Sequence, residues 1–376
     1  MATGLTAERV RGDVEVLARA GLDLEAFLAE ATESVGRAVP WVAACLATHD
    51  PGTHMLTSAR KYGHLCEVNS HDHEFGLVEY GGIEPTAFTE LAVAPVPAAG
   101  VHLVYDGEIG RSTRMDTFMR PNFGFGDEAR LVFRDSGQAW GAMALFRGPD
   151  DAPFATGDIE FLASLSTQFA RGVRAGMLTR LAVAAPAMEP MGPAVVIVDA
   201  DDRIVQMSAG AEQRIARLPH GAGAADPMSP VSALVGAARR YARGETATPP
   251  RARLRAADGM WLVLHASPLT GLGDRAGEVV VTIEEARPPE IVALVVAAFD
   301  LTPRERDVTQ LVLQGVDTKE IAATLHLSAY TVQDHLKSVF EKADVRSRRE
   351  LIARIYFDQY VPRMGTELSP SGWFAG

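Results

Sequence analysis

The chain has few of the features that stabilise secreted proteins or anchor membrane proteins. It contains only two cysteines, Cys45 and Cys66, among 376 residues, which excludes a disulfide framework and fits a reducing compartment. No run approaches the roughly 18–20 uninterrupted apolar residues of a membrane span. The first twenty residues are charged and amphipathic and lack the apolar core of a signal peptide. We therefore expect a cytoplasmic protein with no membrane partner.

Motifs of the common enzyme classes are also missing. The sequence contains no G-x-x-x-x-G-K phosphate loop, no G-x-S-x-G elbow, no H-E-x-x-H helix and no Rossmann glycine fingerprint. A phosphorelay receiver domain would need a late lysine, whereas residues 1–182 contain only Lys61. We expect no catalytic residues, no enzymatic activity and no cofactor, while a small-molecule effector of unknown identity stays open.

What the chain does contain is a series of helix-start signals in residues 301–357. The pattern Ser/Thr/Asp-x-x-Glu occurs at 302–305, 317–320 and 347–350, and Ser328 precedes a further apolar stretch. Such a pattern lets a side chain cap the first turn of a helix. Apolar residues follow at helical spacing, namely Val308, Leu311, Val312, Ile321, Ala322, Leu325, Val332, Leu336, Val339, Leu351, Ile352 and Ile355. These signals predict four short helices.

The second and third of these helices have the spacing of a helix-turn-helix unit, with His326 and Leu327 as the connection. In such a unit the second helix, here residues 329–342, enters the major groove of DNA. Its outward residues would be Tyr330, Gln333, Asp334, Lys337, Ser338 and Lys342. Glutamine pairs with adenine, lysine with guanine and aspartate with cytosine. Phosphates are the expected partners of Lys319, Thr331, Arg346, Arg348 and Arg349. The alternative is a helical bundle with an ordinary solvated face.

Residues 301–357 resemble the C-terminal DNA-binding domain of the LuxR/NarL transcription regulators. The matching stretches are Leu-Thr-Pro-Arg-Glu at 301–305, Lys-Glu-Ile-Ala at 319–322, Thr-Val at 331–332, and the single residues His335, Lys342, Val345 and Arg348. The resemblance implies that double-stranded DNA is the partner and that Gln333, Asp334 and Lys337 read bases. His335 would then be a packing residue.

The chain departs from the family pattern at three places. Asp317-Thr318 stand where Ser-Asn is usual, Gln333-Asp334 where a lysine is common, and Ala343 where leucine is usual. The Gln333-Asp334 change bears on base preference, so the operators of relatives do not transfer. Residues 301–360 hold nine basic and nine acidic residues, so the whole net charge of −12 lies outside them. We therefore expect modest affinity of the segment alone, strong salt dependence, and a gain from dimerisation.

Residues 1–182 predict a domain of mixed helices and strands. Helical spacing covers 1–38 and 154–181, and strands are predicted at 41–48, 55–58, 100–105, 129–135 and 139–147. This order of helix, hairpin, irregular middle, hairpin and closing helix resembles a GAF domain. The resemblance implies a small-molecule or protein-interaction module, although a fold does not assign an activity. Core packing is the expected role of its aromatic residues, ahead of lining a ligand pocket.

A linker rich in Pro, Ala and Met at 182–192 precedes a second domain, predicted at 190–287. Strands predicted at 195–198 and 204–207, with an acidic turn between them and an amphipathic helix after them, resemble the opening of a PAS domain. Further strands are predicted at 251–256, 260–268 and 278–284, and a loop at 218–230. A helix at 291–299 then leads into the helix-turn-helix domain, predicted at 297–362.

His64, Cys66, His71 and His73 form the one cluster with metal-ligand chemistry. Their spacing, H-x-C-x4-H-x-H, matches no established zinc pattern, and a polar surface loop is the favoured interpretation. These residues stay weak metal candidates.

The expected fold class is multidomain, with α+β GAF-like and PAS-like sensor domains followed by an all-α, four-helix LuxR-type domain. The leading hypothesis is a sequence-specific transcriptional regulator, dimeric, controlled by a signal sensed in the N-terminal domains. Helices 154–181, 290–299 and 347–357 are candidate links or dimer surfaces. The alternative is a ligand- or metal-binding sensor whose C-terminal domain serves mainly oligomerisation.

Overall fold

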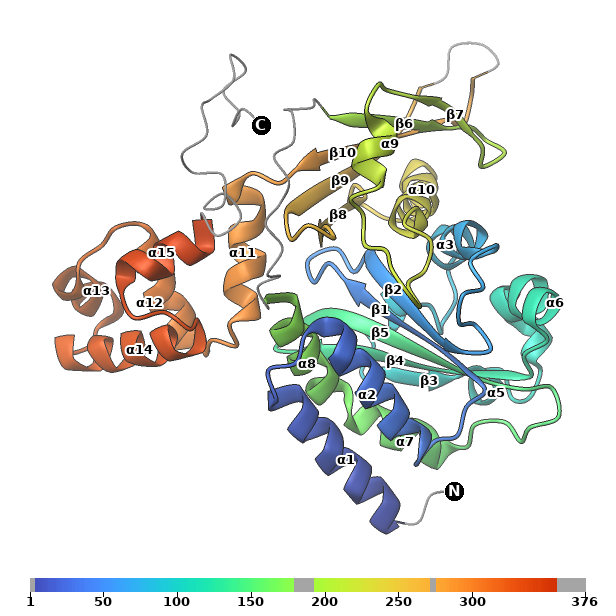
Figure 1. Ribbon diagram of the computed structural model, residues 1–376, viewed down its shortest axis with the longest axis horizontal. Helices are drawn as coiled ribbons and strands as arrows, with labels where there is room; N and C mark the ends of the chain where they lie inside the picture. The colour runs from blue at the N-terminus through green and yellow to red at the C-terminus, as the bar shows by residue number, and fades with distance from the viewer. Residues whose placement is uncertain (1–3, 179–192, 271–274, 357–376) are drawn as a thin grey trace. The chain divides into compact units, whose positions relative to one another are not determined.

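The computed structural model describes residues 4–178, 193–270 and 275–356. These residues form two compact units (Figure 1). The first comprises residues 4–178 and 193–285 and contains two five-stranded sheets, whereas the second comprises residues 286–356 and is helical. The predicted fold class is confirmed at this level, as two α+β parts followed by a helical part.

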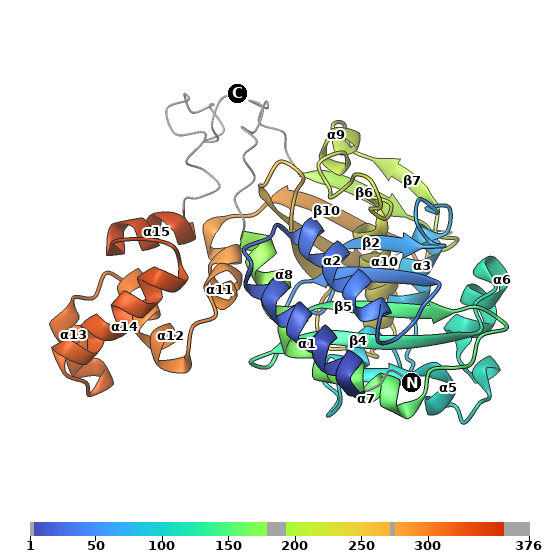
Figure 2. The same ribbon diagram turned by 60° about the horizontal axis from the view of Figure 1, so that its bottom comes forward.

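The first sheet has the strand order β2-β1-β5-β4-β3, and every neighbouring pair is antiparallel. Four helices cover one of its faces (Figure 2). On that face Phe133 stacks on Phe169, with ring centroids 4.7 Å apart. The strands are β1 Ala43–His49, β2 Leu56–Gly63, β3 Ala98–Gly100, β4 Asp127–Asp135 and β5 Gln138–Arg147, and the helices are α1 Gly4–Arg19, α2 Leu24–Gly36, α7 Thr156–Ser164 and α8 Ser166–Leu178.

The opposite face of this sheet is covered by the irregular middle of the domain. Val132, Ala144 and Phe146 point into that side and join a core with residues of the covering segments. These segments are α3 Asp72–Gly81, α4 Phe88–Leu91, α5 Val101–Val104, the 3-10 turn η1 Ile109–Arg111, the π-helical turn η2 Met115–Met119 and α6 Arg120–Phe123. Both faces of the sheet are thus buried, which explains why the middle of β5, residues 139–146, contains no charged residue.

The prediction of a strand at 100–105 is wrong. β3 ends at Gly100 and α5 follows at once. The carboxylate of Asp127 accepts the N–H of His102 at 3.0 Å and so satisfies one donor in the first turn of α5. This long-range bond outweighs the strand preference of the valines in this segment.

The single helix predicted at 154–181 is two helices, α7 and α8. The break occurs at Leu165, because the Ser166 hydroxyl bonds to the backbone of β4. It accepts the N–H of Arg134 at 2.9 Å and donates to the carbonyl of Val132 at 2.7 Å. The last residues of the predicted helix, 179–181, lie outside the described part of the chain.

The second sheet repeats the strand order of the first, as β7-β6-β10-β9-β8, again antiparallel throughout. Its strands agree with the predicted ones to within about two residues, and β7 matches at both ends. They are β6 Ala194–Val198, β7 Ile204–Met207, β8 Arg251–Arg255, β9 Trp261–Pro268 and β10 Val279–Glu285. The helices are the short α9 Ala211–Ile215 and α10 Ser229–Ala242, of which the sequence did not predict the second.

The two sheets belong to one unit because α3 of the first packs against α10 of the second (Figure 1). A Cβ at Gly236 would lie 2.9 Å from the Gly81 nitrogen and 3.1 Å from the Leu77 carbonyl oxygen. A Cβ at Gly76 would lie 2.9 Å from the Ala233 nitrogen. Glycine therefore allows a backbone approach that any side chain would prevent.

Polar contacts reinforce this union of the two sheets. The buried carboxylate of Asp50 accepts from the Arg253 backbone N–H at 2.8 Å and from its guanidinium at 2.6 Å. The edge of β2 also pairs with the loop before α10, through Lys61 N–H to Gly223 O at 2.8 Å and Ala225 N–H to Ala59 O at 2.9 Å. Buried charges are tolerated when they are paired and hydrogen-bonded, as Asp50 and Arg253 are.

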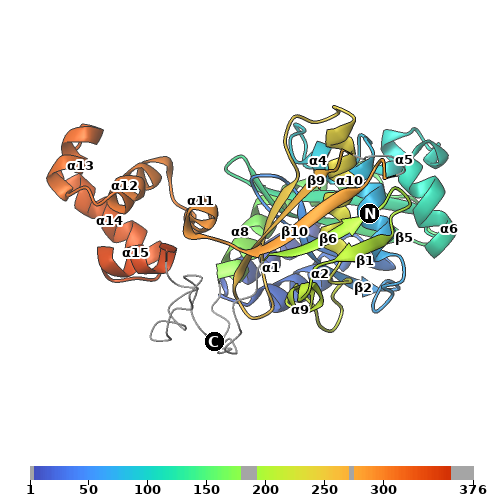
Figure 3. The same cartoon turned by 90° about the horizontal axis from the view of Figure 1, so that it is seen from above.

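The second unit is a bundle of helices (Figure 3). The four predicted helices of the tail are confirmed, and the helix before them packs against the last one. Among the described residues, no helix combines the length and apolar character needed to cross a bilayer. The helices are α11 Pro288–Ala298, α12 Pro303–Leu313, α13 Thr318–Leu325, α14 Ala329–Lys342 and α15 Arg348–Tyr356.

The glycine contact between α3 and α10 leads to a stability prediction. Gly236→Ala should destabilise the protein by about 1–3 kcal/mol, because the added Cβ meets backbone atoms that cannot move independently. Gly12→Ala in α1 is the control, since a Cβ there meets nothing within 4 Å and should stabilise by about 0.5–1 kcal/mol. Urea denaturation of the full chain measures both. A Gly236→Ala protein as stable as the control variant contradicts the packing described here.

Candidate nucleic-acid interface

The helix starts of the second unit are capped by the residues that the sequence singled out. Thr302 and Glu305 form a reciprocal capping box, with Glu305 N–H to Thr302 Oγ1 at 3.3 Å and Thr302 N–H to Glu305 Oε2 at 2.7 Å. The Asp317 carboxylate accepts the N–H groups of Lys319 and Glu320 at 2.7 and 3.0 Å. Ser328 accepts the Thr331 N–H at 3.0 Å. Each cap satisfies orphan donors of a short helix, so the bundle holds its helix ends in place.

The connection between α13 and α14 is as tight as predicted. His326 ends α13 in the left-handed conformation, with φ at 55°, and Ser328 caps the next helix. Val332, Leu336 and Val339 of α14 are buried. These contacts fix which side of α14 faces outward.

The outward side of α14 carries the predicted base readers. Tyr330, Gln333, Asp334 and Lys337 are exposed. Tyr330 lies three and four residues before Gln333 and Asp334, and Lys337 lies four and three residues after them, so the four lie along one stripe of the helix. Tyr330 is 77% exposed, an unusual state for an aromatic side chain. The stripe presents to a partner the amide of Gln333, which donates and accepts, and the carboxylate of Asp334, which accepts. It also presents a cation and an aromatic ring, from Lys337 and Tyr330.

The residues predicted to bind phosphates differ in their exposure. Lys319 and Arg346 are exposed, whereas Thr331 and Arg348 are half-buried. The Thr331 hydroxyl lies 2.8 Å from that of Ser328. The guanidinium of Arg348 donates to the Val316 carbonyl at 2.8 Å and to the Thr318 hydroxyl at 3.1 Å. Arg348 therefore holds the loop before α13 in addition to any role at a ligand.

Of the residues expected to face outward, Ser338 is half-buried, whereas Lys342 is exposed as expected but is bonded within the domain. Its ammonium donates to Glu305 Oε2 at 2.6 Å, and Ser338 donates to Glu305 Oε1 at 2.6 Å. These bonds tie the end of α14 to the start of α12. Burial alone would raise the pKa of Glu305, but the bonds from Lys342, Ser338 and the Thr302 N–H outweigh it and lower that pKa to about 2. Sequence spacing could not reveal this contact, because the partners lie far apart along the chain.

The four weak metal candidates do not come together. His64 and Cys66 are exposed on the loop after β2. The His73 ring bonds to the Ser232 hydroxyl at 2.6 Å and to the Asp202 carbonyl at 3.0 Å, in the other sheet domain. His71 stands edge-on to Phe123, with centroids 5.5 Å apart. Within the described ranges, no group of three or more His, Cys, Asp or Glu side chains is placed to hold a metal ion.

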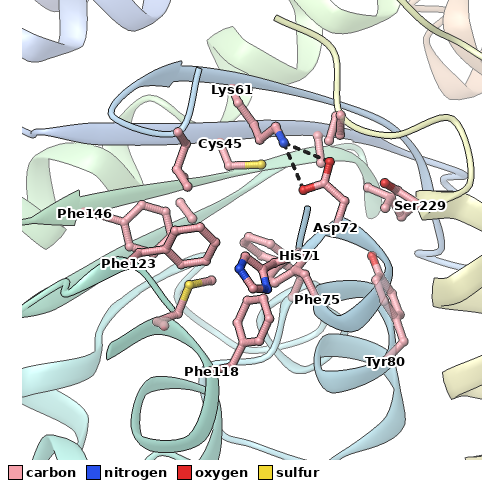
Figure 4. A pocket seen from close by; sticks show the side chains of 18 residues that line it. Cys45, Lys61, His71, Asp72, Phe75, Tyr80, Phe118, Phe123, Phe146 and Ser229 are labelled. Carbon is pink, nitrogen blue, oxygen red and sulfur yellow. Dashed lines mark hydrogen bonds and ion pairs between the residues drawn. The ribbon is translucent and has the colours of Figure 1, made fainter. Parts of the chain in front are cut away.

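A cavity of about 50 Å³ lies instead where His71 points, between the first sheet and α3 (Figure 4). The sequence favoured core packing for the aromatic residues of this region, and no motif marks the cavity. Its lining comes from β1, β2, β5, α3, α4, η2, α6, the start of α10 and the loops beside β2, α3 and α10. Residues so scattered along the chain become a site only through the tertiary fold. The aromatic members of the lining are Phe75, Tyr80, Phe88, Phe118, Phe123 and Phe146.

Comparison with known proteins identifies the second unit. The family model for bacterial regulatory proteins of the luxR family matches residues 300–355. The spore germination protein GerE of Bacillus subtilis is 38% identical over 55 residues, which is 15% of this chain and 74% of that protein. A helix-turn-helix transcriptional regulator of Mycobacterium bovis is 48% identical over 52 residues, or 14% of this chain, but the chain spans only 6% of its length. The chain belongs to the luxR family through this domain.

The similarity to solved structures is weaker. The complex of Vibrio cholerae VqmA with ligand and DNA shares 18% identity, covers 50% of this chain and 87% of that chain, and has a TM-score of 0.24. A TM-score this low assigns no fold to residues outside the helix-turn-helix domain.

The Glu305 contact leads to a pH prediction. Because its pKa is lowered from 4.5 to about 2, the stabilisation is complete above about pH 4.5 and is lost as the pH falls toward 2. Glu305→Gln should lower hydrogen-exchange protection of α12 at pH 7 by about tenfold or more and remove this part of the pH dependence. Exchange of the full chain, read by mass spectrometry, measures both effects.

Glu341→Gln provides the control, because Glu341 is an exposed glutamate on α14, the helix that also carries Lys342. It should leave the protection of α12 and its pH dependence unchanged. Equal behaviour of the two variants rules out the proposed role of Glu305.

Proposed function

We propose that the protein is a sequence-specific transcriptional regulator that binds double-stranded DNA through α14. The observation that carries this proposal is the exposed stripe of Tyr330, Gln333, Asp334 and Lys337 on a helix whose opposite side is buried and whose start is capped. A rigid helix with free polar groups on one side is what major-groove recognition requires. Membership of the luxR family supports the same function.

Each exposed group has a distinct role in this proposal. Gln333 pairs with adenine, Lys337 with guanine, and Asp334 accepts from the amino group of cytosine. Lys319 and Arg346 bind phosphates and set the position of α14 on the duplex. Tyr330 and Thr331, at the first turn of α14, donate hydrogen bonds from their hydroxyl groups to the DNA backbone. Arg348 contributes to DNA binding indirectly, because it holds the loop at Val316 and Thr318 in place.

The N-terminal residues act as the sensing part in this proposal, with a GAF-like domain at 1–182, a PAS-like domain at 190–287 and the DNA-binding domain at 297–362. The order of helices and strands in the two sheets supports these assignments. A cytoplasmic homodimer bound to a roughly palindromic operator fits the small, neutral reading domain, because two copies double the contacts. A signal acts by favouring one of two arrangements with different affinity for DNA.

The test uses the full chain, duplexes selected from a random library, and fluorescence anisotropy. Gln333→Ala and Lys337→Ala should each lower affinity for the selected site by about 1–3 kcal/mol and relax the preference at one base pair. Lys319→Ala should weaken binding to all duplexes and make the slope of log K against log salt shallower by about 0.9.

Arg304→Ala is the charge-matched control, since Arg304 is exposed on α12 and paired with Asp307 at 3.3 Å. It should leave base preference unchanged. If the α14 variants bind every duplex as the parent chain does, α14 does not read DNA, and the domain serves mainly oligomerisation.

A further inference from the structure

The cavity beside α3 has the chemistry of an apolar binding site. Phe75, Phe118 and Phe123 face it with Phe146 and the sulfur of Cys45 (Figure 4). Phe118 and Phe123 are edge-on, with centroids 5.8 Å apart. An aromatic ring placed among them gains edge and stacking contacts in addition to its burial. The lining therefore favours an aromatic occupant.

The charged groups at the upper end of the cavity are already compensated. Lys61 donates to both carboxylate oxygens of Asp72, at 2.9 and 2.8 Å, to the Val68 carbonyl at 2.5 Å, and to the Asn69 side chain. Burial raises the pKa of the Cys45 thiol to about 12, so that group is neutral. A charged occupant would lose its hydration without finding an unpaired counter-charge. An uncharged occupant avoids this penalty.

The second sheet domain closes part of this cavity. Ala225 and Ser229, from the loop before α10 and its first residue, belong to the lining. The Asp72 carboxylate that pairs with Lys61 also accepts the Asp226 N–H at 2.8 Å. An occupant would therefore contact residues of both sheet domains, at a position where Asp72 bonds to the second domain.

We propose that this cavity is a binding site for a small, uncharged, single-ring aromatic molecule, enclosed jointly by the two sheet domains. The volume of about 50 Å³ is below the roughly 150 Å³ of an apolar cavity that holds benzene, so part of the lining must move on binding. Phe118, Met119 and Phe123 supply that room. They stand on the π-helical turn η2 and on α6, and π-helical turns are uncommon and concentrate at functional sites.

Asp72 decides the charge preference of the site. With Asp72 present the ammonium of Lys61 is neutralised, and a neutral ring is preferred over a carboxylate. Asp72→Asn removes that compensation and leaves Lys61 facing the cavity as an unpaired cation. A ring that bears a carboxylate then gains the missing counter-charge. The identity of residue 72 thus sets which chemical class the cavity accepts.

Fluorine NMR on the full chain without DNA tests the site with three probes of similar size: fluorobenzene, 4-fluorobenzoate and 4-fluorobenzylammonium. We expect fluorobenzene to bind at least tenfold more tightly than either charged probe. Ala144→Met and Ala59→Met, from two different strands of the lining, should each weaken fluorobenzene binding more than tenfold. Ala20→Met, an exposed residue after α1, should leave it unchanged. If one filling variant fails to fold, the other decides.

Asp72→Asn should raise the affinity ratio of 4-fluorobenzoate to fluorobenzene about tenfold, whereas a purely structural role of Asp72 would lower both affinities together. The proposal is overturned if fluorobenzene does not bind, if both filling variants bind it as the parent does, or if the parent prefers the carboxylate. Since no DNA is present, failure of this site and failure of the DNA-binding proposal are separate outcomes.

Discussion

The buried ion pair between Glu79 of α3 and Arg130 of β4 fixes the part of the molecule on which both the cavity and the domain union depend. Glu79 Oε2 accepts from Arg130 at 2.8 Å, and its other oxygen accepts the Phe88 N–H at 2.8 Å. Arg130 also lies 3.5 Å over the Phe88 ring. Removing charges from water is costly, and breaking such a pair by deleting one partner leaves the other uncompensated. The pair therefore holds α3 on the sheet in one position.

Neighbouring charges complete this network. Arg114 donates to Glu128 at 2.8 Å and to the Thr86 hydroxyl at 3.0 Å, and its side chain is only 2% exposed. Its backbone N–H bonds Glu84 at 2.8 Å. Arg114 immediately precedes η2, so the same network that fixes α3 also anchors one end of the segment that carries Phe118 and Met119. The segment that carries Phe118 and Met119 is thus attached to a rigid base at one end.

The position of α3 then determines that of α10. Glycine contacts leave no space between their backbones, and a packed interior transmits displacements that it cannot absorb. An occupant that pushes on Phe75 acts on the same helix that carries Gly76 and Glu79. The start of the same helix carries Asp72, which bonds to the loop before α10. In the proposed complex, an occupant would therefore contact both sheet domains, and coupling between sites requires that such contacts differ between two states.

Sequence patterns predicted the elements whose signals are local. The capping residues of α12 to α14 and the strands with clear turn chemistry are examples, since each depends on residues a few positions apart. α10 escaped prediction because residues 229–238 are all buried, so no polar stripe marks a helical period. The cavity, the Glu305–Lys342 bond and the turn of Arg348 toward Val316 depend on partners far apart in the chain, and no spacing rule encodes them.

Two of the three departures from the family pattern meet at Thr318. Its hydroxyl accepts from Arg348 at 3.1 Å and lies 3.4 Å from the Gln333 amide nitrogen. A bond of 3.4 Å between exposed groups is weak, so in the proposed DNA complex Gln333 would exchange it for a base edge at little cost. Before binding, however, the contact limits the rotamers of Gln333, and a pre-ordered side chain loses less entropy on recognition. Asp317-Thr318 and Gln333-Asp334, two departures far apart in the sequence, thus act at one place on the surface that α14 presents.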